Sequence, residues 1–322
     1  MATRRIRSLL MGPFLALLWA VSCLVPSPLT GQSRDRGPLV LDLPSSTRAM
    51  ALGNAFVLGD RDSDALFYHP GVLDRVQGMS ASLQRYSTRG RLLAVSAGTD
   101  WWSGGVALGA QVLAYEAPAT RPISGQDVLE LPDHEASLRE RGDVSLSEMV
   151  LSAGYGREMF GIRLGLVGKL VDQRFGPVRG STAAIDVGAA LAPGPFTLAL
   201  SARNLGWDLT LGGKDIPLPT HVALGASSPR VPVGPLDLAA TTSVDYRVDG
   251  DVISSAGLEV AYWPVVGRTF LARVGYAHVP QERQQMPITF GGAFTGDDII
   301  LEYAYQGFDT GDPTHRFGIG WR

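Results

Sequence analysis

The amino-acid sequence predicts an all-β fold: a transmembrane, up-and-down antiparallel β-barrel of about 14 strands with a small N-terminal hatch, or plug, inside it. Three observations predict this fold. An export signal begins the chain, and after residue 77 the sequence falls into short segments of alternating hydrophobicity. Only 18% of the 322 residues are charged, compared with roughly a quarter in ordinary soluble domains. Few charges suit a sheet with one face in lipid and the other in a crowded interior.

Residues 1–31 have the pattern of a secretory signal peptide. Arginines form its positive end, an apolar core covers residues 9–24, and small residues lead to a cleavage site after Gly31. Cys23 leaves two interpretations, a removed thiol of the apolar core or the attachment site of a lipid, and the residues before it fit a lipobox only loosely. An exported barrel is expected in the outer membrane of a Gram-negative-type bacterium.

Residues 32–78 are patterned neither like the signal nor like the strands, so we expect them to form the hatch. The run 44–47 offers an N-cap for a short helix at 48–52, and an acidic turn follows at 60–64. The turn resembles half a calcium loop without its glycine and distal glutamate, which leaves adventitious calcium as a lesser alternative. The candidate hatch residues are Arg48, Asp60, Asp62, Asp64, His69 and Pro70.

Residues 79–322 are predicted to form the barrel, because apolar and polar residues alternate in one short run after another. Turn residues separate the runs. The expected strands are 79–86, 91–99, 104–115, 145–156, 160–173, 181–191, 196–204, 220–228, 236–246, 252–262, 269–278, 287–294, 298–305 and 315–321.

The connections between these strands alternate in length, as in bacterial outer-membrane barrels. One set is short, and nearly every long connection belongs to the other set, including the longest, at 116–144. An even number of strands with this asymmetry places both termini in the periplasm. The 116–144 connection is rich in charged residues and is either a solvated surface loop or a partner-binding element.

The alternation within each strand predicts which face meets lipid. In the run 163–171, leucines share one face, and Arg163 and Lys169 share the other. A mid-depth Arg or Lys on the lipid face costs about 2–4 kcal/mol, so the charges are expected to point inward. Inward charges of both signs balance, which predicts pairing across the lumen or with Arg48 and the acidic turn of the hatch. The lumen charges singled out are Arg163, Lys169, Asp186, Arg203, Glu259, Arg273, Glu302 and Arg316.

Patterns that carry catalysis or cofactor binding are not found in the sequence. It contains neither a Gly-x-Ser-x-Gly elbow nor a His-Glu-x-x-His pair, and its five histidines are dispersed without metal spacing. A net charge of −3 and the absence of a basic stripe give no reason to expect nucleic acid. We therefore expect no enzymatic activity, no cofactor, no metal and no nucleic-acid partner.

Several short motifs, in their order along the chain, resemble the PorV/PorQ family of outer-membrane proteins, which is related to FadL-type channels for hydrophobic compounds. They include Leu-Asp-Leu-Pro-Ser-Ser-Thr-Arg at 41–48, Tyr-His-Pro-Gly at 68–71, Arg-Asn-Leu-Gly at 203–206 and Thr-His-Arg-Phe-Gly-Ile-Gly at 314–320. The N-terminal part is most similar to PorQ. The resemblance implies a plugged barrel and, in some bacteria, a part in type IX secretion. The sequence departs from the family at His69, where the family usually has Asn, and in ending on Arg322 rather than on an aromatic residue.

Two functions remain open at this point. The resemblance implies a non-enzymatic barrel that anchors or escorts exported surface proteins, in a process similar to type IX secretion. The alternative is FadL-like passive transport of hydrophobic small molecules, through an apolar pocket near Phe56, Phe67 and Tyr68. The expected partners are outer-membrane lipid together with exported surface proteins, secretion components or hydrophobic small molecules. A fixed plug suits the first function, and a movable gate suits the second.

Overall fold

The computed structural model describes residues 37–56, 61–86, 90–117, 144–247, 250–278, 285–309 and 312–322. The predicted signal peptide, hatch residue Asp60 and most of the predicted 116–144 loop lie outside these residues. Within the described part, no helix is long and apolar enough to span a membrane.

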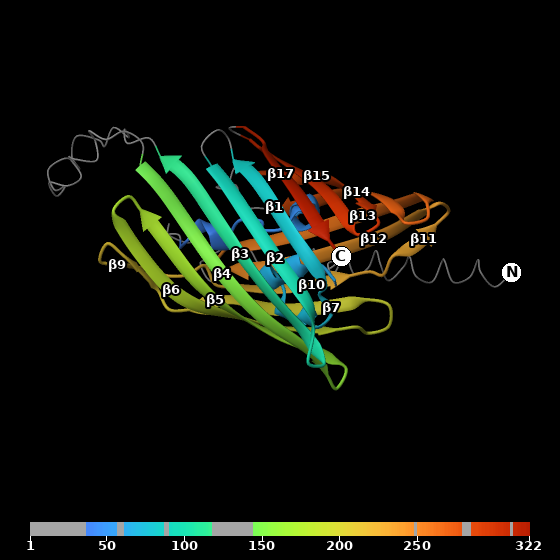
Figure 1. Ribbon diagram of the computed structural model, residues 1–322, viewed down its shortest axis with the longest axis horizontal. Coiled ribbons are helices and arrows are strands. Elements are labelled where there is room, and N and C mark those ends of the chain that lie inside the picture. The colour runs from blue at the N-terminus through green and yellow to red at the C-terminus, as the bar shows by residue number, and fades with distance from the viewer. Residues whose placement is uncertain are drawn as a thin grey trace.

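The strands form one closed antiparallel barrel (Figure 1). Each strand pairs with its neighbours in chain order, β1 pairs with β17, and β10 pairs with both β7 and β12. These pairings close a ring of fourteen strands, as the sequence predicted. The fourteen are β1 (Gly78–Tyr86), β2 (Gly90–Trp101), β3 (Gly104–Ala117), β4 (Val144–Met159), β5 (Ile162–Phe175), β6 (Val178–Leu191), β7 (Thr197–Gly206), β10 (His221–Ser227), β12 (Leu236–Arg247), β13 (Val252–Val265), β14 (Arg268–His278), β15 (Gln285–Gly296), β16 (Ile299–Phe308) and β17 (Thr314–Trp321).

The predicted alternation of faces is present in the strands. In β5, Leu164, Leu166 and Leu170 are exposed on the outside, whereas Arg163 and Lys169 are buried inside. An apolar outer face and a polar inner face are typical of barrels that span a membrane. Large exposed hydrophobic side chains cover the outside of nearly every strand.

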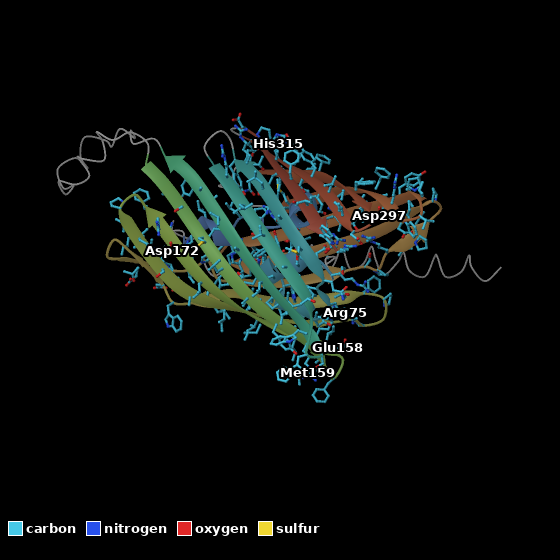
Figure 2. All side chains as sticks on the ribbon, viewed as in Figure 1. Arg75, Glu158, Met159, Asp172, Asp297 and His315 are labelled. Atoms are coloured by element: carbon cyan, nitrogen blue, oxygen red, sulfur yellow. The ribbon has the colours of Figure 1, made fainter. Side chains whose placement is uncertain are left out.

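The two ends of the barrel differ, and we call them the short-turn end and the long-loop end. Met159 and Asp297 lie at the short-turn end, and Asp172 and His315 lie at the long-loop end (Figure 2). The connection expected at 174–180 is shorter in the structure, because β5 and β6 continue to a tight turn between Phe175 and Val178. Gly176 in that turn has a φ of 55°, which glycine adopts without steric cost.

Two predicted connections contain additional strands. The 205–219 connection carries a hairpin of β8 (Leu209–Leu211) and β9 (Lys214–Ile216), closed by two glycines in left-handed conformation. The 229–235 connection contains β11 (Val231–Val233), which continues β10 alongside β12 after an interruption. Such three-residue strands are too short to show alternation, which is why the sequence did not predict them.

The hatch segment consists of four short helical elements and lies within the ring of strands (blue in Figure 1). Ser46 caps the second of them by accepting a hydrogen bond from the Ala49 amide at 3.3 Å. Pro70 is at the start of the fourth, where its missing N–H costs nothing. The elements are η1 (Leu39–Leu41), α2 (Thr47–Ala51), η2 (Ser63–Phe67) and η3 (Pro70–Arg75).

Glycines on the inner face of the wall let the hatch backbone touch the strands. A Cβ atom at Gly165 would lie 1.9 Å from the Pro70 carbonyl oxygen, and one at Gly105 would lie 2.0 Å from the Leu73 carbonyl oxygen. Any side chain at these positions would displace η3. Leu66, Phe67 and their buried apolar neighbours in η2, η3 and the wall form the largest hydrophobic cluster.

Candidate functional site

Arg316 attaches the hatch to the wall through backbone carbonyl groups. Its guanidinium donates to the carbonyl oxygens of Pro44 and Ser45 and also to Gln84 and Ser82 of β1. The residue is fully buried. Arg316 lies on the inner face, and its partners are two peptide carbonyls and two neutral side chains rather than the carboxylates that charge balance suggested.

Glu259 is the centre of a buried ion-pair network that joins the hatch to β13 and β14. Its carboxylate contacts Arg48 at 3.0 Å, Arg273 at 2.8 Å and Arg230 at 2.6 Å. Arg273 also contacts Glu302 at 2.6 Å. The structure thus brings together four residues that the sequence singled out, one from the hatch and three from the lumen, and adds Arg230.

Lys169 and Asp186 form a pair within the wall. The Lys169 ammonium lies 2.6 Å from the Asp186 carboxylate and 2.8 Å from the Asn204 side-chain oxygen. Asn204 occupies a bulge between β6 and β7 with a φ of 57°. Its backbone N–H donates to the Asp186 carboxylate at 2.7 Å. This group of residues fixes the local bend of the sheet.

The two described acidic-turn carboxylates, Asp62 and Asp64, form no ion pair with the lumen arginines that the sequence singled out, contrary to the sequence-based expectation. Asp62 pairs with Arg48 of the hatch itself at 2.6 Å and with C-terminal Arg322 at 3.2 Å. Asp64 accepts a hydrogen bond from Ser96 at 2.7 Å. The hatch carboxylates that do reach wall cations are Asp74, 2.6 Å from Arg163, and Asp42. Sequence reasoning missed both, because only tertiary packing shows which side chains meet.

Burial shifts the titration of the two acidic-turn residues in opposite directions. For Asp62, burial alone would raise the pKa, but the guanidiniums of Arg48 and Arg322 outweigh it and hold the pKa below its usual value. For Asp64, burial raises the pKa to about 6, since the hydrogen bond from Ser96 compensates only in part.

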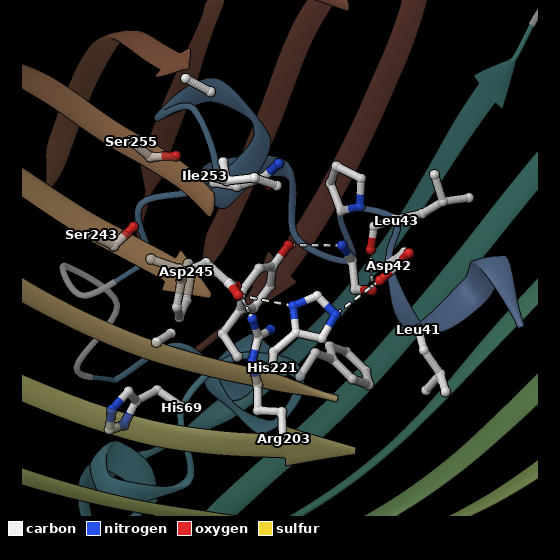
Figure 3. Close-up of a pocket in the computed structure, with 18 of the residues that line it drawn as sticks. Leu41, Asp42, Leu43, His69, Arg203, His221, Ser243, Asp245, Ile253 and Ser255 are labelled. Carbon is white, nitrogen blue, oxygen red and sulfur yellow. Dashed lines mark hydrogen bonds and ion pairs between the residues drawn. The ribbon is translucent and has the colours of Figure 1, made fainter. Parts of the chain in front are cut away.

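A cavity of about 290 Å³ lies between the hatch and the wall formed by β7, β10, β12 and β13. Leu39, Leu41, Leu43, Phe56 and Phe67 supply apolar lining from the hatch. Polar and charged side chains line the opposite wall (Figure 3). The cavity is therefore amphipathic, and it is large enough for a substituted ring, since an engineered cavity of ~150 Å³ already binds benzene.

The charged wall of the cavity is internally paired. His221 bridges two carboxylates, with Nε2 2.9 Å from Asp42 and Nδ1 2.9 Å from Asp245 (Figure 3). Arg247 holds the other oxygen of Asp42 at 3.0 Å, and Arg203 holds the other oxygen of Asp245. Arg203 was predicted as a lumen charge. His221 was not singled out from the sequence, because its partners Asp42 and Asp245 lie 179 and 24 residues away in the chain.

His69 lines the same cavity from the residue that precedes η3. It is 5% exposed, and neither ring nitrogen has a hydrogen-bond partner among the described residues. Burial, and then the nearby guanidinium of Arg203, lower the pKa of His69 to about 4, so the ring is neutral at pH 7.

Two further cavities lie on the other side of the hatch, towards the short-turn end. One, of about 110 Å³, is lined by Ser46, Arg48 and Asp64, and the other, of about 370 Å³, by Arg48, Arg61 and Arg322. Neither shares a lining residue with the 290 Å³ cavity. Ser45 lines the 290 Å³ cavity and Ser46 and Arg48 line the 110 Å³ cavity, so this part of the hatch lies between the two. No group of three or more His, Cys, Asp or Glu side chains in the described ranges is placed to hold a metal ion.

Comparison with solved structures finds the same architecture in channels of other bacteria. The Pseudomonas putida toluene transporter TodX matches with a TM-score of 0.50 and 12% identity, over 91% of this chain and 99% of that one. The Ralstonia pickettii toluene transporter TbuX matches with a TM-score of 0.51 and 12% identity, over 85% and 97%. A Pseudomonas aeruginosa FadL homologue matches with a TM-score of 0.50 and 10% identity, over 89% and 99%. At these identities the likeness shows the fold alone, a closed antiparallel barrel like those of these channels.

No family model matches the sequence, and no curated protein matches it. The predicted resemblance to PorV/PorQ is therefore not shown by these comparisons.

Proposed function

We propose that the protein is a passive outer-membrane channel for small hydrophobic molecules, with the hatch as its gate. The observation that carries this proposal is the cavity of about 290 Å³ beside the hatch, partly lined by apolar hatch side chains. Ligand pockets of roughly 300 Å³ or more that combine apolar walls with a few polar groups are typical small-molecule sites. The architecture shared with toluene transporters supports the same proposal.

The arrangement of compartments gives the hatch the role of a gate. A molecule in the 290 Å³ cavity is separated from the short-turn compartments by α2 and the residues beside it. Passage then requires this segment to move. With an even number of strands, both termini belong at the short-turn end, which we assign to the periplasm.

The proposal is tested by uptake of radiolabelled toluene into Gram-negative cells that express the barrel. We expect a higher initial rate than in cells with an empty vector. Ala223→Phe, which fills the cavity from the inner face of β10, should return the rate to the vector level. Val222→Phe is the matched control, because Val222 is on the outer face of the same strand. Equal uptake with and without a folded wild-type barrel would refute the proposal.

The escort of exported surface proteins stays a prediction from the PorV/PorQ resemblance. Its candidate binding element is the charged 116–144 connection, and residues 118–143 of that loop lie outside the described residues. Capture of surface proteins by the intact barrel, lost on deleting the loop, is the result that would favour it. No captured protein, together with unchanged secretion in a deletion strain, would count against it.

A further inference from the structure

Three polar groups without partners lie on one side of the 290 Å³ cavity. The His69 ring, the Ser201 hydroxyl and the Arg203 Nε line it, and none of them has a hydrogen bond of normal geometry to a described residue, although the Leu200 backbone lies close enough to the imidazole to oppose the lowering of its pKa. His69 is 5% exposed and Ser201 is 1% exposed. Buried polar groups are nearly always hydrogen-bonded, because leaving one unpaired is costly. Unpartnered side chains in a cavity wall are therefore available to the polar group of a bound ligand.

The three groups are neighbours in space. Ser201 of β7 pairs in register with Gly188 of β6. A Cβ atom at Gly188 would lie 3.3 Å from His69 Cε1, so the imidazole lies over this part of the sheet. Arg203 is two residues beyond Ser201 and lines the same cavity, and its guanidinium is near enough to His69 to help lower the pKa of the imidazole. Arg247 Nε also lacks a partner, but it belongs to β12, two strands away from β7.

Hydrogen-bonding capacity identifies the kind of group that fits. A neutral imidazole offers one N–H donor and one bare nitrogen that accepts. The serine hydroxyl can donate and accept, and the Arg203 Nε only donates. A ligand hydroxyl complements this set, because it both donates and accepts. A carboxylate cannot donate to the bare imidazole nitrogen.

The charges that line the cavity also favour a neutral ligand. The guanidinium of Arg203 is already paired with Asp245, and that of Arg247 with Asp42. His221 lies between the same two carboxylates, and Lys169 is paired with Asp186. Among the described residues that line the cavity, every Lys and Arg side chain has an acidic partner, so an anionic ligand would compete with existing ion pairs.

The apolar lining indicates the chemistry of the part of the ligand that carries the hydroxyl. Phe56 stacks on Tyr68 with ring centroids 4.8 Å apart, and Phe56 and Phe67 both line the cavity. Aromatic walls favour a ring held by stacking or edge contacts.

From this geometry we infer that the cavity binds a neutral, hydroxyl-bearing hydrophobic molecule of the phenol class, whose hydroxyl is held by His69, Ser201 and the Nε of Arg203. The inference rests on the proposed function and narrows its substrate class from hydrophobic molecules in general to those with one polar hydroxyl.

The test compares 4-methylphenol with toluene, which has the same ring and methyl group but no hydroxyl. Binding is measured by titration calorimetry on the full barrel in nanodiscs, with empty nanodiscs subtracted. We expect 4-methylphenol to bind at least about tenfold more tightly than toluene, since toluene leaves buried polar groups unpaired. His69→Phe should abolish the preference without weakening toluene binding, and Ser201→Ala should reduce it several-fold.

Ser243→Ala is the matched control, because Ser243 lines the same cavity from β12 and is outside the unpartnered set. It should keep the full preference. Heat-modifiable migration on gels establishes that each variant is folded. If His69→Phe does not fold, the result for Ser201→Ala tests the inference. A third probe, 4-methylbenzoate, should bind more weakly than 4-methylphenol.

Equal affinity for toluene and 4-methylphenol would overturn the inference, and so would a preference that survives both variants or tighter binding of 4-methylbenzoate. If water alone satisfies these groups, the two probes bind alike. The uptake assay separates this failure from failure of the proposed function. Equal uptake of both compounds above the vector level would support the channel function and contradict the hydroxyl-binding site. Selective binding of 4-methylphenol without uptake would support the site and contradict the channel function.

Discussion

Arg316 of β17 donates from Nη2 to the backbone carbonyl oxygen of Ser45 at 2.6 Å, across 271 residues of sequence. The contact holds a peptide group and not a side chain, so the chain path of the hatch is fixed at the point where it enters α2. Because the guanidinium is fully buried, each bond forms in a low-dielectric interior, where losing it leaves an unpaired group.

Replacement of Arg316 by Met should loosen the hatch from the wall. The carbonyls of Pro44 and Ser45 would lose their donors while remaining buried, at a cost of about 1–3 kcal/mol each. We expect faster proteolysis within residues 37–56 and a lower urea midpoint in lipid vesicles. Arg174→Met is the control, since Arg174 is half exposed near the end of β5. Unchanged protease resistance in Arg316→Met would show that other contacts suffice to hold the hatch.

Gly165→Ala should displace η3 from the wall, whereas Gly168→Ala on the same strand should not. A Cβ atom at Gly165 would lie 1.9 Å from the Pro70 carbonyl oxygen, whereas one at Gly168 meets nothing nearer than 4.0 Å. Overpacking of this kind costs roughly 1–3 kcal/mol. The urea midpoint should fall for Gly165→Ala only, and an equal midpoint for the two variants would contradict the contact between hatch and strand.

Asp64 should make the hatch less stable as pH rises. Its pKa is raised to about 6 in the folded state from 3.8, so the native state favours the protonated carboxyl. The stabilisation by that proton is complete below pH 4 and is lost as pH rises through 6. Asp64→Asn keeps the oxygen that accepts from Ser96 and removes the titration.

The measurement for Asp64 is the difference in unfolding free energy between Asp64→Asn and wild type from pH 4 to pH 7. The variant should gain on the order of 2–3 kcal/mol relative to wild type across that range. Asp62 and His69 titrate in both proteins, so their contributions cancel in the difference. A difference that does not change with pH would mean that Asp64 is not desolvated.

The barrel itself was predictable from the sequence, because the alternation of apolar and polar residues that defines each strand is a local pattern. Each strand meets lipid on one face, so Leu164 and Lys169 reveal their sides by parity alone. Strand ends were predicted within a few residues wherever alternation continued to the turn. The short β11 was not predicted, because it has only three residues to show a pattern and Pro232 is one of them.

The partners inside the barrel were not predictable, because they depend on where distant segments meet. Inward placement of Arg203, Glu259 and Arg316 followed from parity, yet the choice of Asp245, Arg48 and two carbonyls as their partners did not. His69 was singled out as a hatch residue, and only the structure shows that both its ring nitrogens are unpaired beside a cavity. Unsatisfied groups are a property of packing and leave no mark in the sequence.

Whether the hatch moves can be decided with a disulfide between Thr47 of α2 and Gly318 of β17. The Thr47 Cβ lies 3.3 Å from the position of a Cβ at Gly318, which is close to the ~3.5–4.5 Å that disulfides span. The chain has one cysteine, Cys23, and it lies in the predicted signal, so the pair has no competing thiol in the mature barrel.

If α2 moves to join the two compartments, oxidised Thr47→Cys/Gly318→Cys should lose most of its toluene uptake, and reduction should restore it. The two single-cysteine variants, treated with the same oxidant, should transport at the wild-type rate. Thr47 is a suitable site because its hydroxyl has no partner among the described residues, so its removal breaks no hydrogen bond. Full transport by the oxidised pair would mean that α2 stays fixed while molecules pass, and the gate would then have to lie elsewhere in the hatch or the wall.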